Sequence, residues 1–91
     1  MKWKAEYKKT FLKELSKLPL EIKNIIEDIA FGKPEFDNPF NELPLEKMSG
    51  YKDKYKIRSG NYRIGLTIHS NKKIIEFSRV AHRKDIYKIF P

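Results

Sequence analysis

Residues 51–68 read YKDKYKIRSGNYRIGLTI, and this stretch decides the fold. Apolar and polar residues alternate on both sides of Ser59-Gly60-Asn61, as they do in strands that bury one face. A short, turn-like connection between two such runs is typical of an antiparallel hairpin. A third alternating run around Ile75 and Phe77 follows Ser70-Asn71-Lys72. The C-terminal half is therefore predicted to form three successive antiparallel strands.

The N-terminal half is predicted to contribute one strand and two helices. Residues 3–7 alternate in the same two-residue period, which favours a strand. From Thr10, a suitable N-cap, apolar residues recur at helical spacing until Pro19 ends the run. A second helical pattern extends from residue 20 to Gly32, a residue type favoured just beyond helix C-termini.

The remaining segments complete an α+β pattern. Residues 33–49 contain Pro34, Pro39 and Pro44 and are predicted to form a loop that directs Phe36, Phe40 and Leu43 inward. A last helical turn is expected within residues 84–90. The predicted order is βααβββ, with an N-terminal helical hairpin packed on one face of an antiparallel sheet. A chain of 91 residues is expected to form one domain, residues 1–91.

Composition narrows the class of protein. The hydrophobic fraction of 40% is enough for one core. The absence of cysteine excludes a disulfide scaffold, and two histidines far apart in the sequence support no metal site, so neither cofactor nor metal is expected. The N-terminus has no apolar stretch of the kind that signal peptides and membrane spans need. A cytoplasmic protein with no membrane partner is expected.

The net charge of +8 is confined to the second half of the chain. Residues 1–50 carry nine lysines and nine acidic residues, whereas residues 51–91 carry eleven Lys and Arg residues and three acidic ones. A face that serves only solubility normally mixes both signs, so this excess favours binding of a polyanion such as nucleic acid. Cations that simply solvate the sheet and protect its edges remain the alternative interpretation.

The pairing of the two hairpin strands predicts that several of these cations lie on one face of the sheet. Pairing the apolar residues of the two strands requires partner numbers that add to an odd value. Lys56 then lies opposite or diagonal to Arg63, and Gly65 lies beside Lys54 or Lys56, where a ligand could approach the bare backbone. The cations predicted to project from the first strand of the hairpin are Lys52, Lys54, Lys56 and Arg58.

The segment around the end of the last strand adds further candidates. The two-residue period predicts that Arg79 shares a face with Phe77, away from the cations. His82, Arg83 and Tyr87 then supply an imidazole, a guanidinium and a phenol in close sequence. As alternatives, His82 is an ordinary surface or capping residue and Tyr87 is a core residue.

Two stretches resemble the signature of RelE-type toxins of the RelE/ParE superfamily: residues 55–65, YKIRSGNYRIG, and residues 77–87, FSRVAHRKDIY. Length and element order agree, so the resemblance covers nearly the whole chain. It implies a fold similar to small microbial ribonucleases and a cognate antitoxin protein as partner. It also implies a type II toxin that acts as a ribosome-dependent endoribonuclease, cleaving mRNA in the A site and inhibiting translation.

The resemblance further implies individual roles. Aligned on Tyr62-Arg63, this chain has lysines at both catalytic-strand positions and an arginine at the phosphate-binding position. The implied catalytic residues are Lys54, Lys56, Arg63, Arg83 and Tyr87. The predicted RNA- or phosphate-binding residues are Lys52, Arg58, Arg63, His82 and Lys84. The segment between Arg83 and Tyr87 is shorter than in RelE, and some branches use a C-terminal histidine, so the residue that handles the proton stays open among His82, Arg83 and Tyr87.

Metal-free RNA cleavage requires removal of the 2′-hydroxyl proton, stabilisation of the phosphorane charge and a proton for the 5′-oxygen. Because the cationic strand offers almost no carboxylate, Lys54 or Lys56 is predicted to act as the base or to stabilise the alkoxide, with Arg63 clamping the phosphate. The ribosome would position the mRNA. The alternatives are a ParE-type toxin that inhibits gyrase, a non-enzymatic basic nucleic-acid-binding module and an inactive toxin.

Overall fold

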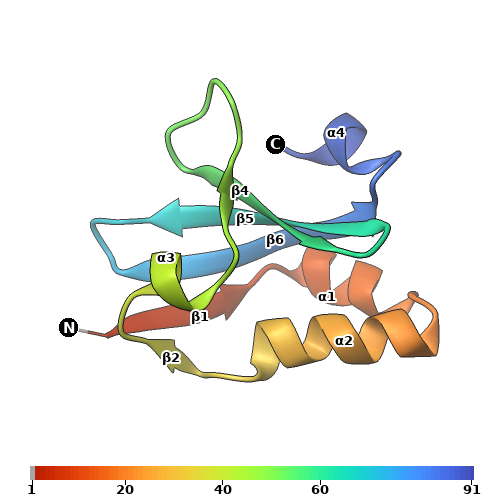
Figure 1. Cartoon of the computed structure of the whole chain (residues 1–91), viewed down its shortest axis with the longest axis horizontal. Helices are drawn as coiled ribbons and strands as arrows, with labels where there is room; N and C mark the ends of the chain where they lie inside the picture. Colours follow the sequence, from red (N-terminus) through yellow and green to blue (C-terminus); the bar gives the residue numbers. More distant parts are fainter. Residues whose placement is uncertain (1) are drawn as a thin grey trace.

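The structure is a computed structural model that describes residues 2–91 as a sheet with helices on both sides. Its elements are β1 (Trp3–Tyr7), α1 (Lys9–Ser16), α2 (Leu20–Phe31), β2 (Glu35–Phe36), α3 (Pro39–Glu42), β3 (Glu46–Lys47), β4 (Lys54–Ser59), β5 (Tyr62–His69), β6 (Ile74–His82) and α4 (Ile86–Ile89). The helices α1 and α2 lie on one side of the sheet, and α4 lies on the other together with the C-terminus (Figure 1). The predicted α+β class is confirmed.

The six-stranded sheet has the order β2-β1-β6-β5-β4-β3. Strands β4, β5 and β6 form the predicted antiparallel meander. Strand β1 pairs with β6 in parallel, so the sheet is mixed rather than wholly antiparallel. A parallel neighbour needs a long crossover between the strands, and the helical hairpin together with the rest of the chain between β1 and β6 supplies it.

The segment predicted as a loop, residues 33–49, contains three short elements: β2 pairs with β1, β3 pairs with β4, and α3 lies between them. The side chain of Asn38 caps α3 by accepting a hydrogen bond from the Phe40 N–H, 3.0 Å away. Phe36 and Leu43 are buried as predicted. Phe40 is 46% exposed, so the prediction that it points inward is wrong; its ring packs edge-on against Trp3 instead.

Helix α1 begins at Lys9 rather than after a Thr10 cap. The backbone N–H of Lys8 donates to the Phe77 carbonyl at 3.0 Å, so Lys8 still extends the sheet and becomes the N-cap residue. The chain turns directly from strand into helix, which leaves Thr10 inside the first turn. Helix α2 ends at Phe31 with Gly32 as its C-cap, as predicted. None of the helices within residues 2–91 is both long enough and apolar enough to cross a bilayer.

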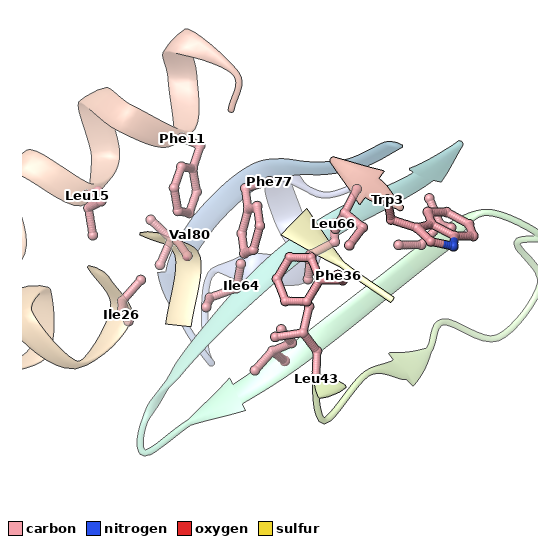
Figure 2. Close-up of a cluster of buried hydrophobic side chains, with 14 residues drawn as sticks. Trp3, Phe11, Leu15, Ile26, Phe36, Leu43, Ile64, Leu66, Phe77 and Val80 are labelled. Atoms are coloured by element: carbon pink, nitrogen blue, oxygen red, sulfur yellow. The ribbon is translucent and has the colours of Figure 1, made fainter. Parts of the chain in front are cut away.

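The main core lies between the sheet and the two N-terminal helices (Figure 2). Phe11 of α1 and Ile26 of α2 are fully buried against it. Ile57, Ile64 and other apolar residues of the two-residue period contribute the sheet side of this core. Because side chains alternate across a strand, the intervening residues of β4 and β5 project from the opposite face.

A β-bulge in β6 changes which residues share that opposite face. Leu66 pairs with Phe77 whereas Gly65 pairs with Arg79, so Ser78 is an extra residue in β6. The extra residue reverses the alternation, and Arg79 joins the face of Gly65 and Lys56 instead of the face of Phe77. The parity prediction for Arg79 is therefore wrong, because the two-residue period does not hold through a bulge.

The bare backbone at Gly65 is not open to a ligand. Gly65 does lie opposite Lys56, as predicted. However, a Cβ atom added at Gly65 would lie 2.5 Å from the ring of Phe90. Phe90 belongs to a second buried cluster with Met48 and Ile86, on the α4 side of the sheet. The C-terminal residues after α4 thus pack flat on the sheet where glycine lacks a side chain.

A Gly65→Ala substitution is expected to destabilise the protein by about 1–3 kcal/mol, because the new methyl group must displace the Phe90 ring. The free energy of unfolding in urea measures this loss. In a Phe90→Ala background the ring is absent, and the same Gly65→Ala change should cost much less. Equal losses in both backgrounds would show that Phe90 is not the group that excludes a side chain at position 65.

Candidate active site

Four cations of the β4–β5 hairpin project from the face of the sheet opposite the main core, and we call this the cationic face. The register pairs Lys54 with Thr67, Lys56 with Gly65 and Arg58 with Arg63. Paired residues share a face, so the cationic face comprises Lys54, Lys56, Arg58 and Arg63. Lys56 lies diagonal to Arg63, as the hairpin parity predicted. The gathering of these cations by one hairpin is confirmed.

Lys56 and Tyr87 form the closest contact between the cationic face and α4. The Lys56 ammonium donates to the Tyr87 hydroxyl oxygen at 2.6 Å and lies 5.2 Å from the centre of the tyrosine ring. Tyr87 is 59% exposed, so it is not a core residue. A phenol oxygen that accepts this bond keeps its own proton free to donate elsewhere. Residues 31 positions apart thus supply an ammonium and a hydroxyl to one point.

Lys54 is held by a chain of buried hydroxyl groups. Its ammonium donates to the Thr67 hydroxyl at 3.2 Å, and the Thr67 and Ser78 hydroxyls lie 3.1 Å apart. Thr67 and Ser78 are both buried, whereas the Asp53 carboxylate, 3.5 Å from the same ammonium, is half exposed. Thr67 and Ser78 were not among the predicted site residues. Thr67 could have been found from the hairpin register, and Ser78 from the two-residue period, because it directly follows the core residue Phe77.

Arg63 and Arg83 lie at the turn between β4 and β5. The Arg63 guanidinium donates from Nη1 to the carbonyl oxygens of Gly60 and Tyr62, both at 2.8 Å. The backbone N–H of Arg83 donates to the Asn61 carbonyl at 2.7 Å, which fixes the segment after β6 against the same turn. The Arg83 side chain is exposed. The turn therefore brings both predicted arginines to one end of the cationic face, and exposed Lys84 follows directly.

An acidic residue from the first half of the chain also reaches the cationic face. Glu46 of β3 pairs with Lys56 of β4, and its carboxylate accepts a hydrogen bond from Arg58 Nε at 3.2 Å. This pairing corrects the prediction that the face is nearly free of acids. The sequence separates Glu46 from the basic half, and only the sheet order places β3 beside β4.

Lys52 does not join the cationic face. Strand β4 begins at Lys54, because the loop before it is closed by the Met48 N–H, which donates to the Lys54 carbonyl at 2.9 Å. Lys52 instead borders a cavity of about 450 Å³ together with His69 and Lys72 at the other end of the hairpin. The predicted strand placement of Lys52 is wrong, because the alternation of residues 51–53 reflects a loop and not a strand.

His82 lies on the opposite side of the sheet from Lys56. His82 pairs with Tyr62, and two residues further along β5 the buried Ile64 pairs with Val80. Residues two apart share a face, so His82 and Tyr62 face the side of the main core. The His82 and Tyr62 rings meet edge-on, with centroids 5.4 Å apart. His82 borders a cavity of about 460 Å³ that Ile22 of α2 also lines. The sheet therefore separates this imidazole from the cationic face, contrary to the predicted grouping.

Arg79 links α1, β6 and the C-terminal residues. Its guanidinium donates to both carboxylate oxygens of Glu14, with the shortest distance 2.7 Å, and to the Ile89 carbonyl at 3.3 Å. Glu14 also accepts a hydrogen bond from the Val80 N–H at 3.1 Å, where β1 has ended and the edge of β6 is free. The hydrogen bond with Glu14 raises the pKa of Arg79 although partial burial opposes it. This network anchors α4, and thereby Tyr87, to the sheet.

A Glu14→Ala substitution is expected to lower the free energy of unfolding by about 2–3 kcal/mol, because it leaves the Arg79 charge and the Val80 N–H without their partner. For a domain of this size the melting temperature should fall by roughly 8–24 °C. Glu14→Gln keeps an acceptor for Val80 and should lose less. Lys13→Ala, an exposed change on the same helix, is the matched control and should leave the melting temperature almost unchanged. Equal melting of the Glu14→Ala and Lys13→Ala variants would contradict the anchoring role.

The arrangement has the chemistry of a phosphodiester site. Guanidinium groups match phosphate oxygens with paired donors, and ammonium groups neutralise the backbone charge of a polyanion. A hydroxyl group held against an ammonium can donate a proton to a leaving oxygen. The cationic face provides all three functional groups within one hairpin and the α4 segment above it.

Comparisons with known proteins agree with this geometry. The family model described as the ParE toxin of the type II toxin–antitoxin system, parDE, matches residues 5–87. The toxin RelE3 of Methanocaldococcus jannaschii is 41% identical over 90 residues, which cover 97% of this chain and 99% of that protein.

Solved structures show the same fold. A crystal structure of the RelB–RelE antitoxin–toxin complex from Methanococcus jannaschii contains a chain that is 36% identical with a TM-score of 0.71, covering 94% of this chain and 99% of that one. The isolated RelE toxin of E. coli has a TM-score of 0.67 at 17% identity, over 97% and 99% of the two chains. This chain therefore belongs to the RelE/ParE family of type II toxin–antitoxin toxins, and it is a RelE-type toxin.

Proposed function

We propose that this toxin is a ribosome-dependent endoribonuclease that cleaves mRNA in the A site and so inhibits translation. The observation that carries the proposal is the Lys56–Tyr87 contact, which sets an ammonium and a free phenol proton on a face already lined by Lys54 and Arg63. A DNA- or RNA-binding module needs the cations but not the buried hydroxyl chain beneath Lys54 or a phenol held by an ammonium.

In the proposed reaction the 2′-oxygen of one nucleotide attacks the adjacent phosphorus, and the bond to the 5′-oxygen breaks. The products are a 2′,3′-cyclic phosphate and a free 5′-hydroxyl. The 2′-hydroxyl proton passes to solvent water, from which Tyr87 regains its own proton after the reaction. Lys56 stabilises the negative charge that develops on the 2′-oxygen, and Lys54 supports it from its fixed position on Thr67. Arg63 clamps the phosphate, and Arg83 stabilises the leaving side. Tyr87 donates a proton to the 5′-oxygen, which its contact with Lys56 leaves it free to do.

The proposal does not need a metal ion, because the protein's own cations neutralise the phosphorane. It does need an external scaffold, since the sheet separates His82 from Lys56, the imidazole of His69 lies beside Glu76 at the far end of β5, and the proton-transfer groups near Lys56 are weak. The ribosome supplies that scaffold by fixing the mRNA in a reactive geometry. Arg58 and Lys84 remain predicted phosphate contacts, whereas the observed positions of Lys52 and His82 remove both from the proposed site. A ribosomal substrate places the toxin in the cytoplasm.

We also propose that a cognate antitoxin neutralises this chain, since the similar M. jannaschii toxin crystallised with RelB. The net charge of +8 and the exposed cationic face suit an antitoxin segment that carries acidic residues. Covering Lys56 and Arg63 would block both the RNA and the ribosome.

Primer extension on mRNA from cells induced for the toxin tests the proposed activity. New 5′ ends inside codons, present when the message is translated and absent when its start codon is removed, are the expected result. A ParE-type action on gyrase, which the name of the matching family model favours, would yield DNA damage and no such ends. A non-enzymatic RNA-binding protein would bind in a salt-sensitive manner and cut nothing.

A further inference from the structure

A cavity of about 400 Å³ adjoins the Lys56–Tyr87 contact and has no role in the reaction described above. Met48 and Phe90, both buried in the second cluster, line it with apolar surface. The two tyrosines Tyr51 and Tyr87 and the two lysines Lys47 and Lys56 also line it. No acidic side chain borders the cavity within residues 2–91. Its size is within the range of sites that hold small ligands, roughly 300–1,000 Å³.

Tyr51 is held at this cavity by a fixed loop. Its backbone N–H donates to the Met48 carbonyl at 3.2 Å, and Gly50 provides the positive φ of 86° that the turn requires. The Met48 N–H in turn donates to the Lys54 carbonyl at 2.9 Å, which closes the loop against β4. Tyr51 is nevertheless 48% exposed, although an aromatic ring of this size gains most when it is buried. The loop therefore presents the ring to solvent without burying it.

The chemistry of the cavity fits a nucleobase attached to a phosphate. A base is flat and stacks on aromatic rings, and this stacking tolerates any base because every base has a π-face. The attached phosphates are anionic and suit the ammonium groups of Lys47 and Lys56. An acidic peptide would use the lysines but would gain little from two exposed phenol rings or from the apolar lining that Met48 and Phe90 provide. The combination of rings and lysines therefore favours a nucleotide.

We propose that this cavity binds the base of a nucleotide next to the scissile phosphate and that Tyr51 is a stacking residue for that base. The inference rests on the proposed function, which places the scissile phosphate near Lys56. The cavity shares Lys56 and Tyr87 with the reacting groups, so a nucleotide held there is adjacent to the bond that breaks. Tyr51 acts on substrate binding and takes no part in proton transfer.

The test compares the Tyr51→Ala and Tyr51→Phe variants with the parent in single-codon cleavage on programmed ribosomes. Loss of stacking is expected to raise the KM for the ribosome complex by roughly 5- to 150-fold in Tyr51→Ala while kcat stays near the parental value. Tyr51→Phe keeps the ring and should behave like the parent. Leu20→Ala, which removes another exposed apolar side chain at a remote position on α2, is the matched control. Melting temperatures of all variants should match the parent, because the Tyr51 side chain is exposed.

Each result decides the inference. A raised KM in Tyr51→Ala alone supports a stacking role. A fall in kcat without a change in KM, or equal losses in Tyr51→Ala and Tyr51→Phe, overturns it. Parental kinetics in Tyr51→Ala, with cutting by the parent enzyme established, overturn the base site but leave the proposed nuclease intact. No cutting by the parent removes the nuclease proposal, and the base site with it.

Discussion

A Lys56→Ala toxin is expected to lose about 10²–10⁴-fold in the rate of mRNA cleavage. The substitution removes the ammonium that contacts the Tyr87 hydroxyl and with it the charge proposed to stabilise the 2′-oxygen. Tyr87→Phe keeps the ring but removes the proton donor, so it should lower kcat with little change in KM. Single-turnover cleavage on programmed ribosomes measures both effects.

The control for Lys56→Ala is Lys52→Ala, which removes an equal charge from the neighbouring loop. Lys52 borders a different cavity, so its loss should leave the single-turnover rate close to that of the parent. If Lys56→Ala cuts as fast as Lys52→Ala, the ammonium at position 56 has no part in the reaction. A Tyr87→Phe variant with parental kcat would assign the proton to another group while leaving the role of Lys56 in place.

Arg63→Ala is expected to abolish growth arrest on induction and to lower cleavage by about 10²–10³-fold, the cost of removing one preorganised donor group from a phosphoryl site. Two carbonyl oxygens of the β4–β5 turn hold its guanidinium, so the side chain is ordered before RNA arrives. Arg83→Ala should have a similar effect. Arg63→Lys keeps the charge but loses the paired donors, and it should recover only part of the activity.

Folding must be preserved for the arginine experiment to be informative. Arg63 donates only to the carbonyls of Gly60 and Tyr62 at the β4–β5 turn, and Arg83 is exposed, so both alanine variants should melt within a few degrees of the parent. Growth curves after induction, with circular dichroism of the purified variants, give both readouts. Growth arrest by both variants at parental strength would remove the arginines from the site.

Much of the site follows from local sequence because one hairpin builds it. The turn Ser59-Gly60-Asn61 and the alternating apolar residues fix the register, and the register alone places Lys54, Lys56 and Arg63 on one face. The same reasoning failed at Lys52 because alternation also occurs by chance in a loop. It failed at Arg79 because a single inserted residue, Ser78, reverses the period.

Groups that approach from distant segments could not be predicted in this way. Glu46 reaches Arg58 only because β3 pairs with β4. Glu14 reaches Arg79 only because β1 pairs with β6 no further than Phe77, which leaves the edge of β6 open from there on. His82 faces the helices because it pairs with Tyr62, whose side chain lies on the helix side of the sheet. These contacts depend on which strands become neighbours, and sheet order is a non-local property.

The sequence by itself determined the α+β class, the three-stranded meander and the shared face of its cations, because hydrophobic periodicity and turn residues act over a few neighbouring positions. Only the tertiary structure decided that Phe90 covers Gly65, that Tyr87 meets Lys56 and that Arg79 is tied to Glu14. The physical reason is that these contacts join segments up to 65 residues apart, where packing and not local preference selects the partner.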